Sequence, residues 1–187
     1  MTAKRGRRPA APGVPSVQDV AEMIRVDHAG EYGAKHIYEG QLAVLGDGPR
    51  NRKGAAAVRR MAAQEQRHLE RFEELILERK VRPTMLSPVW QATGFALGAA
   101  TAFLGLKAAM ACTASVEEVI DEHYARQIER LDGDPELKAA VTRFREDELA
   151  HRSEALAHGA TDTPGYRLLS EAIKAGCRLA IRLSEKI

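Results

Sequence analysis

Residues 58–76, VRRMAAQEQRHLERFEELI, carry the pattern that decides the fold. In an α-helix with about 100° of rotation per residue, one face of this stretch collects residues within about 40° of a common direction. These residues are Val58, Ala62, Glu65, Leu69, Phe72 and Ile76. Glu65 therefore points where the apolar side chains point, and His68 follows it three positions later. A carboxylate directed into a core needs an explanation, because an unpartnered buried charge costs several kcal/mol.

The same pattern recurs in three other segments with helical period. A later segment contains a second Glu-x-x-His unit, formed by Glu148 and His151, on an apolar stripe. Glu31 and Glu117 lie near the centres of the apolar faces of two further segments. Glu31 and Glu65 are 34 positions apart, and Glu117 and Glu148 are 31 positions apart, as a duplicated two-helix unit would give.

Long helical segments are separated by short clusters of Gly, Asp and Pro, and alternating β-branched runs are missing. The chain is therefore predicted to be all-α. The expected helices are 16–46 beginning at Ser16, 54–79, 107–131, 134–158 with Asp134 as N-cap and Pro135 at the first helical position, and an amphipathic 166–187. Two helical pairs joined by one long crossover indicate a ferritin-like four-helix bundle with an extra C-terminal helix.

The crossover, residues 83–106, contains no charged residue. Its length approaches that of a membrane span, but its glycines, Pro88 and Gln91 make it weakly apolar. A helix buried in a larger fold and a helix lying in the membrane interface are the favoured alternatives to a span. Gly94 and Gly98 form a GxxxG motif, which indicates close helix packing.

Composition bounds the class of protein. The 187 residues include 28 Lys plus Arg and 26 Asp plus Glu, a near-neutral balance that gives no reason to expect nucleic acid. A hydrophobic share of 44% fits one folded domain, expected over residues 16–187. Residues 1–15 are basic and proline-rich and are expected to form a flexible tail. Only two cysteines, far apart, favour free thiols in a reducing compartment.

Six residues form a ligand set for two metal ions: Glu31, Glu65, His68, Glu117, Glu148 and His151. The order Glu, Glu-x-x-His, Glu, Glu-x-x-His is that of di-iron and di-manganese carboxylate bundles. We expect one histidine on each metal, Glu65 and Glu148 as bridges, and Glu31 and Glu117 as caps. Coordination positions left open would admit dioxygen.

Other readings of these residues stay open at this point. Any one buried glutamate could instead form a salt bridge, with Arg25, Arg67 or Arg143 as partners. Neighbouring acids could replace a ligand; these are Glu118, Asp121, Glu146 and Asp147, with Asp121 the most plausible. The histidines without a partner at ligand spacing, His28, His36 and His158, are expected at the surface or in capping roles.

Three stretches closely resemble the demethoxyubiquinone hydroxylase family of ubiquinone biosynthesis. They are residues 24–34, IRVDHAGEYGA, residues 94–98, GFALG, and residues 111–118, ACTASVEE. The resemblance covers about residues 20–187 and places the family's iron ligands on the same six residues. It also selects Glu117 over Glu118 and Asp121.

The resemblance implies a mono-oxygenase that uses two iron ions and O2 to hydroxylate the ring of a polyprenylated demethoxyubiquinol. His123 and Tyr124 match a family pair suspected in substrate or electron handling. Tyr124 falls on the ligand face, whereas His123 is turned about 120° from Glu117, so a direct ligand role for His123 is not expected. The uncharged crossover becomes an interfacial element for substrate entry.

The resemblance also implies peripheral attachment to the membrane that holds the quinone. The expected location is the cytoplasmic face of the bacterial inner membrane, with the matrix side of the mitochondrial inner membrane as the alternative. Because no GxGxxG motif or cysteine cluster is found, electrons are expected from an external donor. A lipid-presenting or quinone-biosynthesis partner protein and a homo-oligomer are further expectations that the sequence leaves open.

A second class of function fits the same ligands. A ferritin-like protein could oxidise or store iron without an organic substrate, and ligand spacing alone does not exclude this. The uncharged crossover distinguishes the two classes, because a soluble cage subunit has little use for it.

Overall fold

The computed structural model describes residues 15–46, 48 and 51–186, and in these residues the secondary structure is entirely helical. The helices are α1 (Val17–Leu45), α2 (Arg52–Arg79), α3 (Ser87–Phe103), α4 (Leu106–Ile128), α5 (Pro135–Ala157) and α6 (Tyr166–Lys186), with a short 3₁₀ helix at Ala160–Asp162. The all-α prediction is confirmed. The expected basic tail lies outside the described residues, apart from Pro15.

Two predicted helix starts are confirmed by their caps. The Ser16 hydroxyl accepts a hydrogen bond from the Asp19 backbone N–H at 3.1 Å, and the Asp19 carboxylate accepts one from the Ser16 backbone N–H at 2.8 Å. This capping box satisfies donors that the first helical turn leaves free. Asp134 caps α5 by accepting from the Leu137 N–H at 3.2 Å, and Pro135 is the first helical residue.

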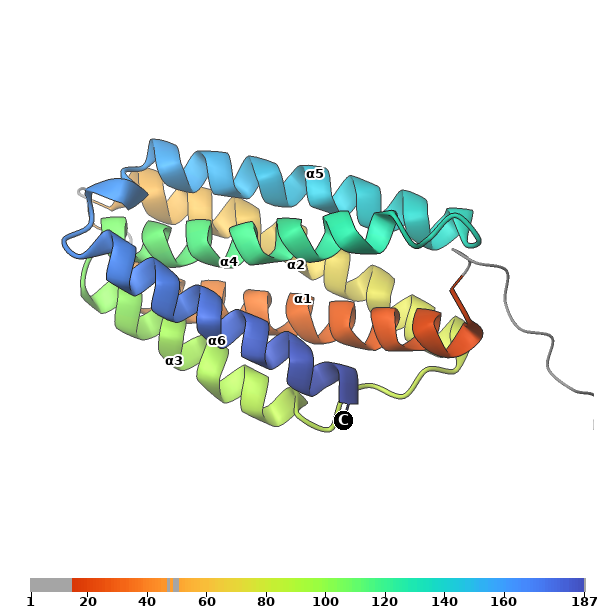
Figure 1. Cartoon of the computed structure of the whole chain (residues 1–187). Coiled ribbons are helices and arrows are strands. Elements are labelled where there is room, and N and C mark those ends of the chain that lie inside the picture. The colour runs from red at the N-terminus through yellow and green to blue at the C-terminus, as the bar shows by residue number, and fades with distance from the viewer. Residues whose placement is uncertain (1–14, 47, 49–50, 187) are drawn as a thin grey trace, which may run out of the picture.

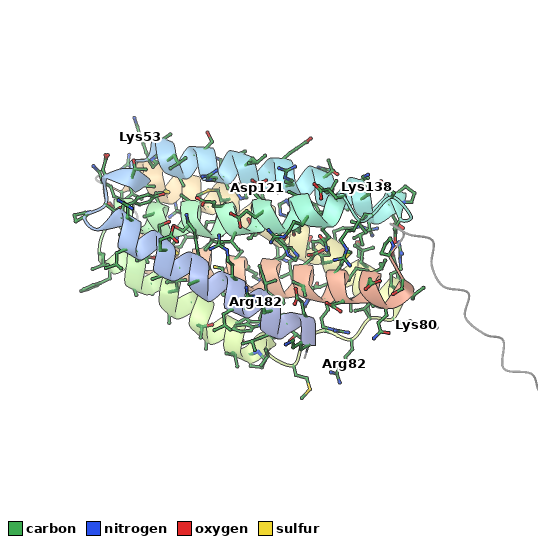
Figure 2. The ribbon with its side chains drawn as sticks, in the orientation of Figure 1. Lys53, Lys80, Arg82, Asp121, Lys138 and Arg182 are labelled. Carbon is green, nitrogen blue, oxygen red and sulfur yellow. The ribbon has the colours of Figure 1, made fainter. Side chains whose placement is uncertain are left out.

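Four long helices form the bundle. α1 packs against α2 and α4 packs against α5, and α3 carries the chain from the first pair to the second (Figure 1). This is the ferritin-like connectivity, two helical pairs joined by one long crossover. Charged side chains such as Lys53 and Arg82 point away from the bundle (Figure 2). The core is therefore formed by the inward helix faces, on which the four glutamates also lie.

The crossover helix α3 lies very close to α1 because glycines of each helix face the backbone of the other. A Cβ atom on Gly98 would lie 1.9 Å from the backbone oxygen of Ile37, and one on Gly40 would lie 2.1 Å from that of Phe95. The GxxxG prediction of close packing is therefore confirmed. The opposite side of α3 is open, and Phe103 at its end is 82% exposed.

The exposure of α3 excludes one of the sequence alternatives. It is not a helix buried on all sides, since only its glycine face is covered. Among the described helices, none combines the length and the apolarity needed to cross a membrane. The amphipathic C-terminal helix is present as α6, which lies along α1 and α4 and is joined to α3 by a hydrogen bond from Trp90 Nε1 to Ser184 Oγ at 3.1 Å.

Candidate metal centre

The six predicted ligands come together in the middle of the bundle. Their side chains fall into two overlapping groups: Glu31, Glu65, His68 and Glu148, and Glu65, Glu117, Glu148 and His151. Within each group, one ligand-type atom from every residue lies within 4.8 Å of the others. Glu65 and Glu148, the two predicted bridges, belong to both groups. All six side chains are at most 2% exposed.

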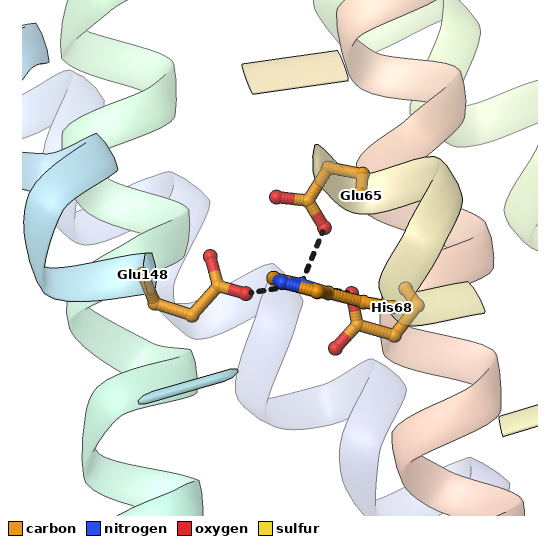
Figure 3. Close-up of side chains that lie close together, drawn as sticks. Glu65, His68 and Glu148 are labelled. Atoms are coloured by element: carbon orange, nitrogen blue, oxygen red, sulfur yellow. Dashed lines mark ion pairs between the residues drawn. The ribbon is translucent and has the colours of Figure 1, made fainter. Parts of the chain in front are cut away.

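Both histidines turn Nδ1 toward the carboxylates. His68 Nδ1 lies 3.1 Å from Glu148 Oε1 and 3.9 Å from Glu65 Oε2, an arrangement visible in Figure 3. His151 Nδ1 lies 3.1 Å from Glu65 Oε1 and 3.2 Å from Glu148 Oε2. Glu65 and Glu148 therefore each direct one oxygen atom toward His68 and the other toward His151.

The atoms that face into the cluster lack ordinary partners. Among the described residues, no hydrogen-bond partner is found for Glu31 Oε2, both carboxylate oxygens of Glu65, His68 Nδ1, Glu117 Oε2 and Glu148 Oε1. Buried polar atoms are almost always hydrogen-bonded, so a group of orphans at one point calls for a ligand. A set of carboxylate oxygens and imidazole nitrogens fits iron or manganese.

The pKa values of these residues reflect the crowding of buried carboxylates. Burial raises the pKa of Glu65 well above its ordinary value, and the nearby Glu148 and Glu31 carboxylates add to this. Burial likewise raises the pKa of Glu117 and Glu148. Burial opposes the charge on His68, but the Glu148 and Glu31 carboxylates beside it outweigh burial and raise the pKa of His68 to about 10. A metal ion bound among these groups would take the place of the protons that such shifts favour.

Two tyrosines leave one oxygen of each capping glutamate free. The Tyr38 hydroxyl on α1 donates to Glu117 Oε1 at 2.7 Å, and the Tyr124 hydroxyl on α4 donates to Glu31 Oε1. In both carboxylates the other oxygen, Oε2, is the orphan. Burial raises the pKa of both phenols well above the ordinary value, so the hydroxyls stay protonated donors.

The outer nitrogen of each histidine is held from the neighbouring helix. His68 Nε2 lies 3.0 Å from Asp147 Oδ2, and His151 Nε2 lies 3.1 Å from Gln64 Oε1. The Gln64 amide also donates to Asp147 Oδ1 at 3.3 Å. Such contacts orient a ligand histidine and fix which ring nitrogen faces the metal. Asp147 is thus an outer partner of His68 in this arrangement.

The other acids considered from sequence have partners elsewhere. Asp121 accepts from Arg145 Nε at 2.6 Å, and Glu118 accepts from Lys174 at 2.6 Å and from Arg152 at 3.0 Å. Glu146 is exposed.

The cationic alternatives do not reach the glutamates. Arg25 Nε donates to the Arg82 backbone oxygen at 2.9 Å, and Arg67 donates to the Ala63 backbone oxygen at 3.0 Å.

His123 lies outside the cluster. Its Nε2 atom is 3.0 Å from Asp27 Oδ1, and the Gln127 amide donates to Asp27 Oδ2 at 2.9 Å. Asp27 is 2% exposed, and burial raises the pKa of its carboxyl group. Asp27 sits one helical turn before Glu31, so a buried carboxylate adjoins that end of the centre. Sequence reasoning missed this residue because its partners lie on α4.

The expectation that His28 and His36 lie at the surface is wrong. Their exposures are 8% and 7%. The reason is that α1 is covered by α2, α3, α4 and α6, which leaves it few solvent-facing positions. His36 Nδ1 pairs with Glu39 at 2.6 Å. His158 occupies the C-cap of α5, which agrees with the capping role expected for it.

An apolar cavity of about 510 Å³ lies beside the cluster, between α1, α3, α4 and α6. Gly30 and Val116 line it, and each directly precedes a capping glutamate. Trp90 lines it from α3 and Ile173 from α6. The exposed residue Gly176 also lines it, so the cavity reaches the surface.

A bundle that buries four glutamates and two histidines at one point has the architecture of the di-metal carboxylate proteins. The chain belongs to the family described as ubiquinone biosynthesis protein COQ7, whose model matches residues 18–184. The family resemblance expected from the sequence is thereby confirmed.

Named relatives include bacterial and mitochondrial proteins. The 3-demethoxyubiquinol 3-hydroxylase of Rhodospirillum rubrum is 51% identical, over 94% of this chain and 82% of the relative. The human mitochondrial NADPH-dependent 3-demethoxyubiquinone 3-hydroxylase is 50% identical, over 90% of this chain and 78% of the relative. The mitochondrial 5-demethoxyubiquinone hydroxylase of Saccharomyces cerevisiae is 40% identical, over 88% of this chain and 77% of the relative.

Proposed function

We propose that the protein is a di-iron mono-oxygenase that hydroxylates the ring of a polyprenylated demethoxyubiquinol in ubiquinone biosynthesis. The observation that carries the proposal is that consecutive residues of α1 and α4 line the apolar cavity and the cluster. Gly30 and Val116 belong to the cavity wall, and the next residues, Glu31 and Glu117, belong to the cluster. A quinol ring in the cavity would therefore meet the metals from the α3 and α6 side.

In this proposal the six buried residues hold two iron ions, with Glu65 and Glu148 between them. Glu31 and His68 complete one position, and Glu117 and His151 complete the other. Bound iron would supply the binding and reduction of O2, of which one atom enters the ring and the other leaves as water. Tyr38 and Tyr124 hold a proton against each capping carboxylate and keep one oxygen of each directed inward.

The walls of the cavity bind the substrate and exclude water. Its lining is mostly apolar, as an isoprenoid tail requires, and small residues such as Gly33 and Ala34 leave room for the tail near the cluster. An iron-storage protein has no need of such a cavity, so the cavity favours the hydroxylase over that alternative.

Peripheral membrane attachment is part of the proposal. The two helices that flank the cavity, together with the residues at their ends, expose large apolar side chains to solvent: Met85, Val89, Phe95, Phe103 and Leu104 at α3, and Leu168, Leu179 and Leu183 on α6. Such side chains lying in the lipid interface would place the cavity mouth at the acyl boundary. The membrane side is the cytoplasmic face in a bacterium or the matrix face in a mitochondrion.

The reaction needs two further electrons, which we assign to an external donor. The names of the human and mouse relatives specify NADPH dependence, so a reduced nicotinamide is the donor class to test first.

The test is the quinone content of a strain that lacks this protein. Demethoxyubiquinone should accumulate, wild-type protein should restore ubiquinone, and Glu148→Ala should not. Glu146→Gln, on the same helix but exposed, should restore it like the wild type. Unchanged quinones in the deletion strain would refute the proposal.

A further inference from the structure

The two halves of the centre are related by a repeated set of cross-helix contacts. Tyr38 and Tyr124 each follow a capping glutamate by seven positions, and each donates to the glutamate of the other half. Gln41 and Gln127 each follow a capping glutamate by ten positions. Gln41 Nε2 donates to Thr113 at 3.3 Å, and Gln127 Nε2 donates to Asp27 at 2.9 Å.

Thr113 and Asp27 complete this repeat, because each precedes its own capping glutamate by four positions. The outer partners of the histidines follow the same rule. Gln64 directly precedes Glu65, Asp147 directly precedes Glu148, and each holds the histidine of the opposite helix. The frame of the centre is therefore symmetric, and the residues within it can be compared position by position.

The comparison shows that charge breaks the symmetry twice, in the same direction. Where the His151 side has the neutral Gln64, the His68 side has Asp147. Where the Glu117 side has Thr113, the Glu31 side has the buried Asp27. Glu31 and His68 belong to one group of ligand atoms, so both additional carboxylates adjoin the same metal position.

A carboxylate acceptor changes a ligand histidine more than an amide does. It increases the basicity of the imidazole that faces the metal, and its negative charge attracts a cation. Asp147 contacts His68 directly and reaches His151 only through the Gln64 amide. Replacing such an outer partner typically costs about 10-fold to 100-fold in metal affinity.

We infer that the two metal positions are unequal, and that the position of Glu31 and His68 fills first because Asp147, supported by Asp27, lies behind it. This inference rests on the proposed di-metal centre. Asp147 is here a positioning residue, since it acts through His68 and does not itself reach the cluster.

The test uses the metal-free full chain and Co²⁺ alone. Binding is followed by titration calorimetry, and the imidazole resonances of His68 and His151 are followed by NMR with ¹⁵N-histidine, assigned with single His→Gln variants. The first equivalent of Co²⁺ should move the His68 resonances, and the second should move those of His151. Two binding steps separated by roughly 10-fold or more are expected.

Variants exchange the partners without touching a ligand. Asp147→Asn should lower the Co²⁺ affinity of the first step roughly 10-fold to 100-fold, so that the two binding steps become similar in affinity. Gln64→Glu should strengthen the step that moves His151. Glu146→Gln removes the same charge one position earlier on α5, at an exposed site, and should change neither step.

The outcomes separate the two claims. Two equal steps that move both histidines together, in the wild type and in Asp147→Asn, would overturn the inference and leave the metal centre standing. Failure of the folded protein to bind two Co²⁺ ions would overturn the proposed centre itself. Thermal unfolding of each metal-free variant verifies that it is folded.

Discussion

The hydroxyl of Tyr38 donates to Oε1 of Glu117 at 2.7 Å, across 79 positions of sequence, and the two side chains are 2% and 1% exposed. This contact ties α1 to α4 at the centre of the bundle. It also determines which carboxylate oxygen remains for a cation, since Oε2 of Glu117 is left without a partner among the described residues. Tyr124 does the same for Glu31 from the other side.

Tyr38→Phe should therefore affect both stability and metal binding. The ring still fills its place, but Glu117 loses a buried hydrogen bond and its oxygen is left unsatisfied, so the free energy of unfolding of the metal-free protein should fall by about 1–3 kcal/mol. Affinity for Co²⁺ should fall as well, because Glu117 is no longer held in one orientation. Tyr32→Phe on the same helix is the control, since the Tyr32 hydroxyl makes only an exposed contact of 3.4 Å with Gln91. Equal effects of the two substitutions would contradict this role for Tyr38.

The stability of the metal-free protein should decrease as pH rises. Burial lowers the pKa of His68, but the nearby Glu148 and Glu31 carboxylates outweigh burial and raise it from 6.5 to about 10. The folded state then binds this proton more tightly than the unfolded chain, so the stabilisation is complete below pH 6.5 and is lost toward pH 10. The raised pKa of the Glu65 carboxyl group acts in the same direction.

Chemical unfolding in EDTA at pH 7.5, 8.25 and 9 measures this slope. One proton contributes at most about 1.4 kcal/mol per pH unit. His68→Gln should make stability less dependent on pH, and saturating Co²⁺ should remove the dependence because the metal replaces the protons. A metal-free protein that becomes more stable from pH 7.5 to 9 would disprove the protonated centre.

Gly98→Ala should destabilise the fold, because the new Cβ atom would lie 1.9 Å from the Ile37 backbone oxygen. Backbone cannot move aside as a flexible side chain can, so α3 must shift from α1, and a loss of about 3 kcal/mol is expected. Gly176→Ala in α6 is the control. Nothing lies within 4 Å of a Cβ atom there. The control should be neutral or more stable by up to about 1 kcal/mol. Thermal unfolding of both variants compares them.

Gly176→Leu should obstruct the cavity without disturbing the metal centre. Gly176 lines the cavity from α6 and has open space at its Cβ position. The KM for a long-tailed quinol should rise by at least roughly 10-fold, with iron content unchanged. Ala175→Leu adds similar bulk on the same helix outside the cavity and should leave KM alone. An unchanged KM in Gly176→Leu would place the substrate elsewhere.

The helices and the cluster were predictable because both depend on local periodicity. Glu65 shares a face with Val58 and Phe72, and that relation holds in any straight helix. The partners across helices were not predictable, because Tyr38 reaches Glu117 and Gln64 reaches His151 only in the register set by packing.

The burial of His28 was missed for a related reason. A helix that is covered on several sides has no clear polar face in its sequence, so periodicity does not indicate which residues are exposed. The repeat of Tyr38 and Tyr124, each seven positions after a capping glutamate, is a signal in the sequence that could have identified both tyrosines.

The central claim is that this chain inserts one atom of O2 into the quinol ring at its buried centre. Mass spectrometry of the product formed by the iron-loaded protein from demethoxyubiquinol, NADPH and ¹⁸O2 tests it directly. We predict one ¹⁸O atom in each hydroxylated ring, none when only the water is labelled, and no product from Glu148→Ala. A hydroxyl oxygen that comes from water, or a labelled product from Glu148→Ala at the wild-type rate, would contradict the account.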